Sequence, residues 1–255
     1  MNVVVLAKYV PNPTGTPEIG DDFLLKREGV EGSLDPGDEP AIEAALEITE
    51  QGGGEVTVVS MGPEPSMDAV RKALSIGVHK GVLITDDSLR GADTLATAMV
   101  LSTAIQLQEP DLVLAAVEST DGYTGTLPQA LAEFLGFPAL TFARKLELKD
   151  GAMRIERQTE GGYEVVEAPL PALVTVTAGA TTPRYPTLKG IMAAKQKPVD
   201  RMSVSDLGLS ADDVKATQRV TSVEPAPERK AGELIEDDGT AAERIAAFLK
   251  EAKVI

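Results

Sequence analysis

The chain has 255 residues, of which 43% are hydrophobic and 4% aromatic, and its formal net charge at pH 7 is −16. This length suits one large domain with an extension, and so acidic a chain lacks the cationic surface that nucleic acid or an anionic membrane requires. The sequence contains no Cys and one histidine, His79, which excludes disulfides, thiolate metal sites and histidine-cluster metal sites and argues against a Ser-His-Asp triad.

The N-terminus leads directly from Met1-Asn2 into a β-branched run, without a charged region followed by a cleavable apolar segment. No apolar run approaches the roughly 20 residues needed to span a bilayer. We therefore expect a cytoplasmic protein without direct membrane insertion.

In the first half of the chain, short β-branched runs alternate with helical segments. Such alternation predicts a parallel sheet with right-handed crossovers and helices on both faces, and the shortage of aromatic residues fits a core of Val, Leu, Ile and Ala. Asp38 is expected to cap the first helix, with Pro40 in its first turn. The expected strands are Val3–Ala7, Glu55–Met61, Gly81–Thr85 and Asp111–Val117, and the expected helices are Asp38–Glu50, Ser66–Ile76, Asp93–Gln108 and Leu127–Leu135.

From Pro138 onward the pattern changes to strands alone. The expected strands are Ala139–Leu148, Met153–Thr159, Tyr163–Glu167 and Ala172–Thr177, with turns at Asp150-Gly151 and Glu160-Gly161-Gly162. We therefore predict an antiparallel section after the parallel core, in which Arg157 and Glu164 pair across the second turn for about 0.2–1 kcal/mol.

The segment Thr182–Lys197 carries two prolines, Pro183 and Pro186, which force an extended and surface-running path. Leu188 follows this path at the start of a basic helical run near Ile191–Lys197. A bulky aliphatic residue there either folds back into its own core or is exposed as a contact for another protein. The residues alone leave both alternatives open.

Residues 183–239 contain little regular apolar pattern before a final amphipathic helix, Thr240–Lys253. We interpret them as an extended arm, and an ordered arm of this length needs another surface to lie on. The predicted organisation is a nucleotide-binding α/β domain over residues 1–182 and a recognition loop with a C-terminal arm over residues 183–255.

No catalytic constellation, Walker loop or G-x-G-x-x-G turn emerges from the sequence. Glycine and hydroxyl residues instead follow the parallel strands, at the sheet edge where open α/β sheets bind ligands. Backbone amides near Gly125 and the Thr124 and Thr126 hydroxyls open a helix, which suits an anion; an ordinary capped loop is the alternative. The loops expected to converge are Ala7–Val10, Ser60–Pro63 and Glu118–Thr126.

Several stretches resemble the electron transfer flavoprotein beta subunit family. The D-x-x-T-G pattern of Asp121, Thr124 and Gly125 is similar to the family's AMP-phosphate loop, and Ile155 to Thr175 matches its hairpin pattern with the Glu160-Gly161-Gly162 corner. The resemblance covers Val3 to about Lys197, including Asp35-Pro36. It departs at Thr126-Leu127, where many members carry glutamine, and at Gly37, where some carry an aromatic residue.

The resemblance implies a Rossmann-like, doubly wound, mostly parallel α/β fold with an antiparallel hairpin section and an extended C-terminal arm. It implies an electron carrier without bond chemistry of its own, paired with an alpha subunit that holds most of the FAD. This chain would bind AMP and pass electrons from acyl-CoA dehydrogenases of fatty acid β-oxidation towards a membrane quinone oxidoreductase. The implied cofactor-binding residues are Ala7, Asp35, Ser60, Met61, Gly62, Asp121, Gly122, Tyr123, Thr124, Gly125 and Thr126; the implied docking residues are Tyr185, Leu188, Ile191, Met192 and Lys195.

Two alternatives remain at this point. One is a bifurcating form of the same family in which a second FAD replaces AMP; against it, we expect Tyr123 to crowd a flavin. The other is a stand-alone nucleotide-binding enzyme or stress-type ATP-binding module, which needs no partner and leaves Pro183–Lys197 unexplained.

Overall fold

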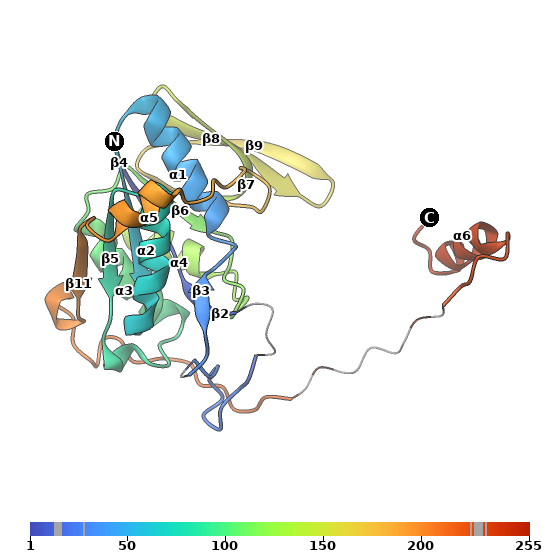
Figure 1. Cartoon of the computed structure of the whole chain (residues 1–255), viewed down its shortest axis with the longest axis horizontal. Helices are drawn as coiled ribbons and strands as arrows, with labels where there is room; N and C mark the ends of the chain where they lie inside the picture. The colour runs from blue at the N-terminus through green and yellow to red at the C-terminus, as the bar shows by residue number, and fades with distance from the viewer. Residues whose placement is uncertain (13–16, 28, 225, 227–231, 233) are drawn as a thin grey trace. The chain divides into compact units, whose positions relative to one another are not determined.

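The computed structural model describes residues 1–12, 17–27, 29–224, 226, 232 and 234–255. Within these ranges the chain forms an α/β fold around one large sheet (Figure 1). Its strands are β1 Asn2–Leu6, β4 Glu55–Met61, β5 Lys80–Ile84, β6 Leu112–Ala116, β7 Ala139–Lys149, β8 Ala152–Thr159, β9 Gly162–Pro169, β10 Ala172–Val176 and β11 Val199–Met202. The α-helices are α1 Glu39–Gly52, α2 Met67–Ile76, α3 Thr94–Gln106, α4 Leu127–Leu135, α5 Leu188–Ala194 and α6 Ala241–Glu251. Short elements complete it: strands β2 Tyr9–Pro11 and β3 Gly32–Leu34, which pair antiparallel, and single turns at Glu64–Ser66, Asp87–Leu89 and Ser205–Leu207.

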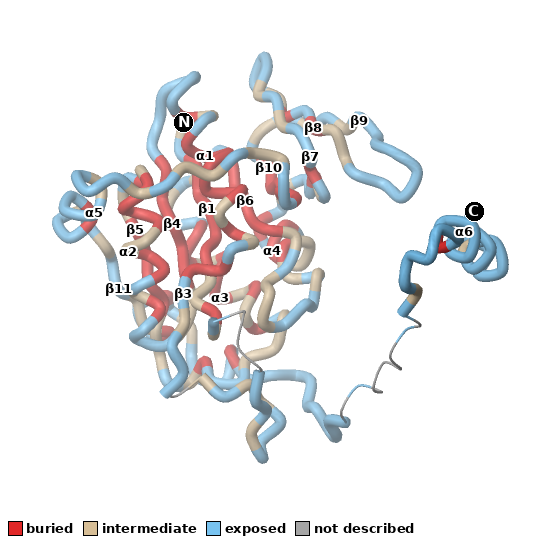
Figure 2. The backbone as a smooth tube through the Cα atoms, turned by 45° about the vertical axis from the view of Figure 1, so that its right-hand side comes forward, coloured by how far each residue is buried: buried red, intermediate tan, exposed pale blue. Residues whose placement is uncertain are grey.

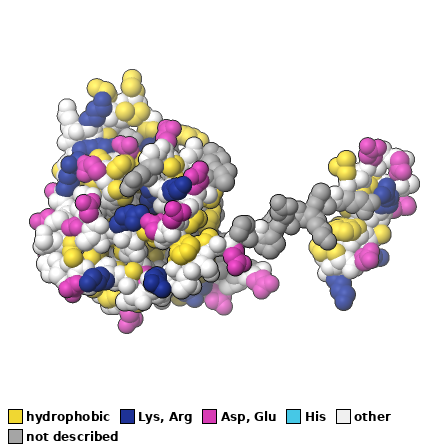
Figure 3. Space-filling model, turned by 90° about the horizontal axis from the view of Figure 1, so that it is seen from below, with side chains coloured by type: hydrophobic (Ala, Val, Ile, Leu, Met, Phe, Trp, Pro, Cys, Tyr) yellow, Lys and Arg dark blue, Asp and Glu magenta, His cyan; other side chains and the backbone are white. Residues whose placement is uncertain are grey.

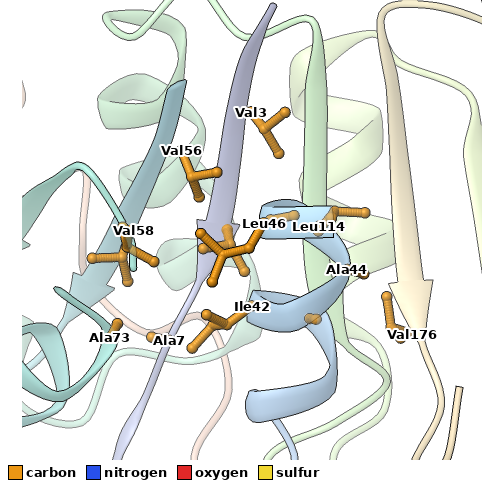
Figure 4. Packing of buried hydrophobic residues seen from close by; sticks show 14 of the residues in the cluster. Val3, Ala7, Ile42, Ala44, Leu46, Val56, Val58, Ala73, Leu114 and Val176 are labelled. Atoms are coloured by element: carbon orange, nitrogen blue, oxygen red, sulfur yellow. The ribbon is translucent and has the colours of Figure 1, made fainter. Parts of the chain in front are cut away.

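The nine-stranded sheet has the order β11-β5-β4-β1-β6-β10-β7-β8-β9, and every pair from β11 to β7 is parallel. Its side chains alternate between two cores. Val3 and Val5 pack with α1 and α2, whereas Val4 packs with α3 and α4. Figure 4 shows the first core, where Ile42 and Leu46 of α1 lie over the sheet, and Figure 2 shows burial concentrated in the central strands. The predicted doubly wound, mostly parallel sheet is confirmed.

The section after Pro138 differs from the prediction in two respects. Strands β7, β8 and β9 pair antiparallel as expected. Strand β10, expected in the same antiparallel section, instead lies between β6 and β7 and is parallel to both. Its five residues are all buried, and a continuous apolar run of this kind is typical of a parallel strand covered on both faces. Arg157 faces Glu164 in register, but no ion pair joins them and the Arg157 Nε donates to the Thr141 carbonyl.

The C-terminal third contributes more to the sheet than an arm would. Strand β11 pairs with β5 at the sheet edge, and Val204, Leu207 and Val214 are buried in the core beside α3. One compact unit therefore spans Met1–Val220 and a second spans Thr221–Ile255, whereas the sequence placed the boundary after Thr182. The second unit contains α6, whose residues are mostly exposed. None of the helices in the described ranges has the length and apolar character needed to cross a membrane.

Candidate functional site

A cavity of about 210 Å³ lies at the carboxyl ends of β1, β4 and β6, next to the N-termini of α3 and α4. This is the edge at which open parallel sheets bind ligands. The three loops expected to converge there all contribute to its wall. The wall is formed by Leu6, Ala7, Lys8, Asp38, Val59, Met61, Ala92, Asp93, Thr94, Thr97, Leu101, Ala115, Ala116, Glu118, Ser119, Gly122, Thr124, Gly125, Leu127 and Pro128. Figure 3 views the molecule from the side of these strand ends, where acidic and basic side chains lie close together on the surface.

Five of the predicted cofactor-binding residues line this cavity: Ala7, Met61, Gly122, Thr124 and Gly125. Gly125 has a φ of 62°, and a Cβ added to it would lie 3.3 Å from Glu118 Oε2. The loop therefore turns into α4 with a backbone conformation that suits glycine. The backbone N–H groups at the start of α4 donate no hydrogen bond to the Thr126 side chain at the N-cap position. That helix end is open to an anionic group.

Two predicted residues, Asp35 and Asp121, do not line the cavity but join the loops that form its wall. Asp35 is fully buried, and its carboxylate accepts hydrogen bonds from the backbone N–H of Gly37 at 2.9 Å and of Thr120 at 2.8 Å. Asp121 accepts from Lys8 Nζ at 2.8 Å and forms an ion pair with Arg27. Both aspartates therefore tie the loop after β6 to segments near the start of the chain.

The other predicted residues lie at the same edge without lining the cavity. Ser60 is 1% exposed, and in the described part of the chain its Oγ and the Thr120 Oγ1 are the buried side-chain polar atoms without a hydrogen-bond partner. Gly62 packs tightly, because a Cβ there would lie 2.3 Å from Ser66 Oγ. Tyr123 and Thr126 are exposed. Tyr123 has 67% of its surface exposed and does not line the cavity, and its expected crowding of a flavin stays a prediction.

Sequence reasoning missed the acidic part of the wall. Asp38 was expected to cap α1, but its side chain makes no cap hydrogen bond and instead accepts from the Lys8 backbone N–H at 2.7 Å. Asp93 caps α3 through Oδ1, while its Oδ2 accepts from the backbone N–H groups of Thr217 and Gln218. The Asp93-Thr94 pair after the predicted strand Gly81–Thr85 could have indicated that Asp93 lies at the site, because a helix there must also begin at the carboxyl edge of the sheet.

The carboxylates around the cavity differ in their electrostatic surroundings. Burial first, and the Asp35 carboxylate second, raise the pKa of Asp38 well above its ordinary value. Burial also opposes ionisation of Asp121, but Lys8 and Arg27 outweigh it and hold the pKa of that carboxyl below its ordinary value. The Lys8 ammonium is thus engaged by Asp121 and Ser119, whereas the carboxylates of Asp38, Asp93 and Glu118 line the cavity.

The second predicted site is α5 with the segment before it. Leu188, which the sequence left between core and surface, has 79% of its surface exposed, and Tyr185 has 90%. Ile191, Met192 and Lys195 are also exposed. Thr187 caps the helix by accepting from the Gly190 N–H at 3.0 Å. The core alternative for Leu188 is therefore wrong, and the five predicted docking residues lie on one short exposed segment.

The fold and the cavity are typical of α/β proteins that bind a nucleotide at the carboxyl ends of parallel strands. A family model described as "Electron transfer flavoprotein domain" matches residues 22–207. The electron transfer flavoprotein subunit beta of Mycobacterium tuberculosis is 39% identical over 264 residues, covering 100% of this chain and 99% of that protein. The subunit beta of Bacillus subtilis is 36% identical over 258 residues, covering 100% of this chain and 100% of that protein. The caffeyl-CoA reductase-Etf complex subunit CarD of Acetobacterium woodii is 34% identical over 98% of this chain and 96% of its own length.

The chain belongs to the electron transfer flavoprotein family, in its beta-subunit branch. Its role is therefore in electron transport as part of a flavoprotein, and the suspected resemblance is confirmed over the full length of the chain. This finding removes the stand-alone nucleotide-binding module as an alternative.

Proposed function

We propose that this chain pairs with an alpha subunit, binds AMP in the cavity at the carboxyl edge and docks electron-donating dehydrogenases through α5. FAD, held mainly by the alpha subunit, supplies the redox chemistry, since it accepts and releases electrons. The chain's own residues bind and position; none is assigned a catalytic role. Residues 221–255, with the exposed apolar side chains Leu234, Ile245 and Phe248, are proposed to pack on the alpha subunit.

The observation that carries the AMP assignment is the cavity itself. Its volume of about 210 Å³ lies below the roughly 300–1,000 Å³ that is usual for ligand pockets, so the smaller nucleotide, AMP, suits it better than FAD. The open N-terminus of α4 and the Thr124 hydroxyl suit a phosphate. Asp38, Asp93 and Glu118 offer acceptors for ribose hydroxyls and an exocyclic amine.

The dehydrogenase assignment rests on the exposed row of Tyr185, Leu188, Ile191 and Met192. Large apolar side chains concentrated on so short a segment mark a protein contact. We assign acyl-CoA dehydrogenases of fatty acid β-oxidation as donors and a membrane quinone oxidoreductase as acceptor, with the heterodimer in the cytoplasm.

A second candidate is the bifurcating form of the family, in which a second FAD takes the place of AMP. The similarity to a subunit of the caffeyl-CoA reductase-Etf complex favours it, and the exposed position of Tyr123 leaves it room. The small cavity is the observation against it.

The test is the nucleotide content of the complex purified from cells that express both subunits. The heterodimer is denatured and its released nucleotides are separated and quantified. The proposal predicts close to one AMP and one FAD per heterodimer. Two FAD and no AMP would establish the bifurcating form instead, and release of FAD alone at one equivalent would reject AMP as the ligand of this cavity.

A further inference from the structure

The α5 segment, here residues Arg184–Lys197, is joined to α1 by hydrogen bonds at its N-terminal end. The guanidinium of Arg184 donates to Glu43 Oε1 at 2.7 Å and to Glu50 Oε1 at 2.6 Å, with further bonds to the second oxygen of each carboxylate. The backbone N–H of Arg184 also donates to Glu43 Oε2 at 2.9 Å. Glu43 is buried, with 4% of its surface exposed. This bidentate geometry fixes both distance and orientation.

The C-terminal end of the segment is fastened to α2 in a reciprocal way. Arg71 of α2 donates to the backbone carbonyls of Ala194 at 2.6 Å and Lys197 at 2.9 Å. In return, Lys197 Nζ donates to the carbonyls of Leu74 and Gly77, at the C-terminal end of α2, at 3.0 and 3.2 Å. A cation at this end of a helix is favoured by the helix dipole.

Between these two ends, α5 lies directly against α2, as Figure 1 also shows. A Cβ added to Gly190 would lie 2.3 Å from the backbone oxygen of Ser75. A backbone oxygen cannot yield as the end of a flexible side chain does. The contact between the two helices therefore requires glycine at position 190.

Hydrophobic burial does not explain why α5 is held in place. Of its seven residues only Ala194 is buried, and a helix this short is unstable by itself in water. Charged clamps at both ends and one close backbone approach hold it instead. The apolar side chains that would ordinarily anchor a helix point outward.

We propose that Arg184, Arg71, Lys197 and Gly190 are positioning residues that pre-organise the α5 segment for its protein partner. The proposal rests on the docking role given to α5 under Proposed function. Without the clamps the segment samples other conformations. The partner then binds only the fraction of molecules in which the segment has its clamped conformation. If that conformer falls to about a tenth of the population, the apparent affinity falls about tenfold.

The experiment compares variants of the heterodimer with both subunits and bound nucleotides present. Gly190→Ala separates α5 from α2, and Arg184→Gln removes the clamp on α1. Each is expected to raise the KM for an acyl-CoA dehydrogenase about tenfold and to leave kcat at saturating dehydrogenase unchanged. Arg184→Lys keeps the positive charge but cannot form the paired hydrogen bonds of a guanidinium, so its KM should lie between those of wild type and Arg184→Gln. The matched control is Arg201→Gln, which removes the exposed Arg201–Glu64 ion pair at 2.6 Å and should change nothing.

A second readout follows α5 without any partner. In the heterodimer alone, the amide of Ile191, which donates to Thr187 O at 2.9 Å, should exchange with solvent deuterium at least several-fold faster in Gly190→Ala and Arg184→Gln. Flavin content, nucleotide content and chemical reduction of the flavin by dithionite should remain as in the wild type. Combining Gly190→Ala with Leu188→Ala should add little to the KM of Leu188→Ala, because both act on the same contact.

The outcomes separate the two proposals. If Leu188→Ala leaves the KM unchanged, the docking role fails and pre-organisation falls with it. If Leu188→Ala raises the KM while Gly190→Ala and Arg184→Gln do not, docking stands and pre-organisation is rejected. A lower melting temperature for the clamp variants with an unchanged KM and unchanged exchange at Ile191 assigns these residues to stability alone and also overturns the proposal.

Discussion

The cavity at the carboxyl edge and the α5 segment differ in where their charged side chains lie. At the cavity they line the ligand space, whereas around α5 they bond to the body of the protein. At the cavity, Asp38, Asp93 and Glu118 contribute to the wall, and the apolar side chains beside them come from the strand ends and from α3 and α4. Around α5, the charges of Arg184 and Lys197 face inward to α1 and α2, and the apolar side chains face solvent. A segment whose apolar side chains stay exposed for a partner cannot be held in place by burying them. Polar bonds to the rest of the protein must hold it instead.

The largest effect on the cavity side is expected for Asp35→Ala. This change leaves the N–H groups of Gly37 and Thr120 without their acceptor in a fully buried place. Loss of charge-assisted bonds of this kind costs about 3 kcal/mol in the free energy of unfolding. Urea unfolding of the heterodimer measures it, and the bound nucleotide should fall below one equivalent. A loss under about 0.5 kcal/mol would show that Asp35 does not join the two loops energetically.

The next effect concerns pH and Asp38. Its folded pKa lies above the ordinary value of 3.8, so its contribution to stability is present below that value and declines as the pH rises through the raised pKa. Asp38→Asn removes this decline and keeps an acceptor for the Lys8 N–H. The variant should therefore gain stability over wild type as the pH rises, by more than the roughly 0.5 kcal/mol of ordinary surface changes.

Asp121 provides the opposite sign as a control for that experiment. Its folded pKa is lowered, so its stabilising contribution is present above the ordinary value and is lost as the pH falls through the folded pKa. Asp121→Asn should therefore be destabilising at neutral pH and converge with wild type in acid. Parallel stability–pH curves for wild type and Asp38→Asn would contradict the electrostatic description of the cavity.

A smaller effect is expected for Gly125→Ala. Alanine at a φ of 62° costs about 1 kcal/mol, and its Cβ adds a close contact with Glu118. Gly151→Ala is the matched control, since Gly151 has a φ of 77° in a hairpin turn with open space around it. Both should lower the melting temperature similarly, and only Gly125→Ala should lower nucleotide content. Equal nucleotide content in the two variants would remove the loop at Gly125 from the site.

Much of the fold could be predicted because local patterns determined it. Strand Glu55–Met61 and helix Leu127–Leu135 have the bounds that the sequence predicted, since a β-branched run and a Pro-to-Gly bounded amphipathic run are local signals. Strand β10 could be located but not placed, because its insertion between β6 and β7 depends on long-range pairing. The same holds for β11, whose residues Val199–Met202 carry two charges and show little apolar pattern.

The sites divide in the same way. Loops that follow parallel strands could be assigned to the cavity, because strand ends meet at one edge. The role of Asp38 could not, since its capping position and its contact with Lys8 compete and only the folded loop decides between them. The clamps on α5 were equally hidden, because Arg184 and Glu43 are separated by 141 residues. Exposure of Leu188 could be proposed from its flanking Pro186 and Lys189 but needed the structure to separate it from the core.

The most direct test of the account is a paired measurement on Leu188→Ala. Leu107→Ala is the control, because Leu107 is also an exposed leucine, at the end of α3 and outside the docking segment. The account predicts that Leu188→Ala weakens dehydrogenase binding by about 1–3 kcal/mol, or about fivefold to about 150-fold. Melting temperature, flavin content and nucleotide content should match wild type, and Leu107→Ala should change nothing. An undiminished rate of electron transfer from the dehydrogenase to the Leu188→Ala heterodimer would contradict the account.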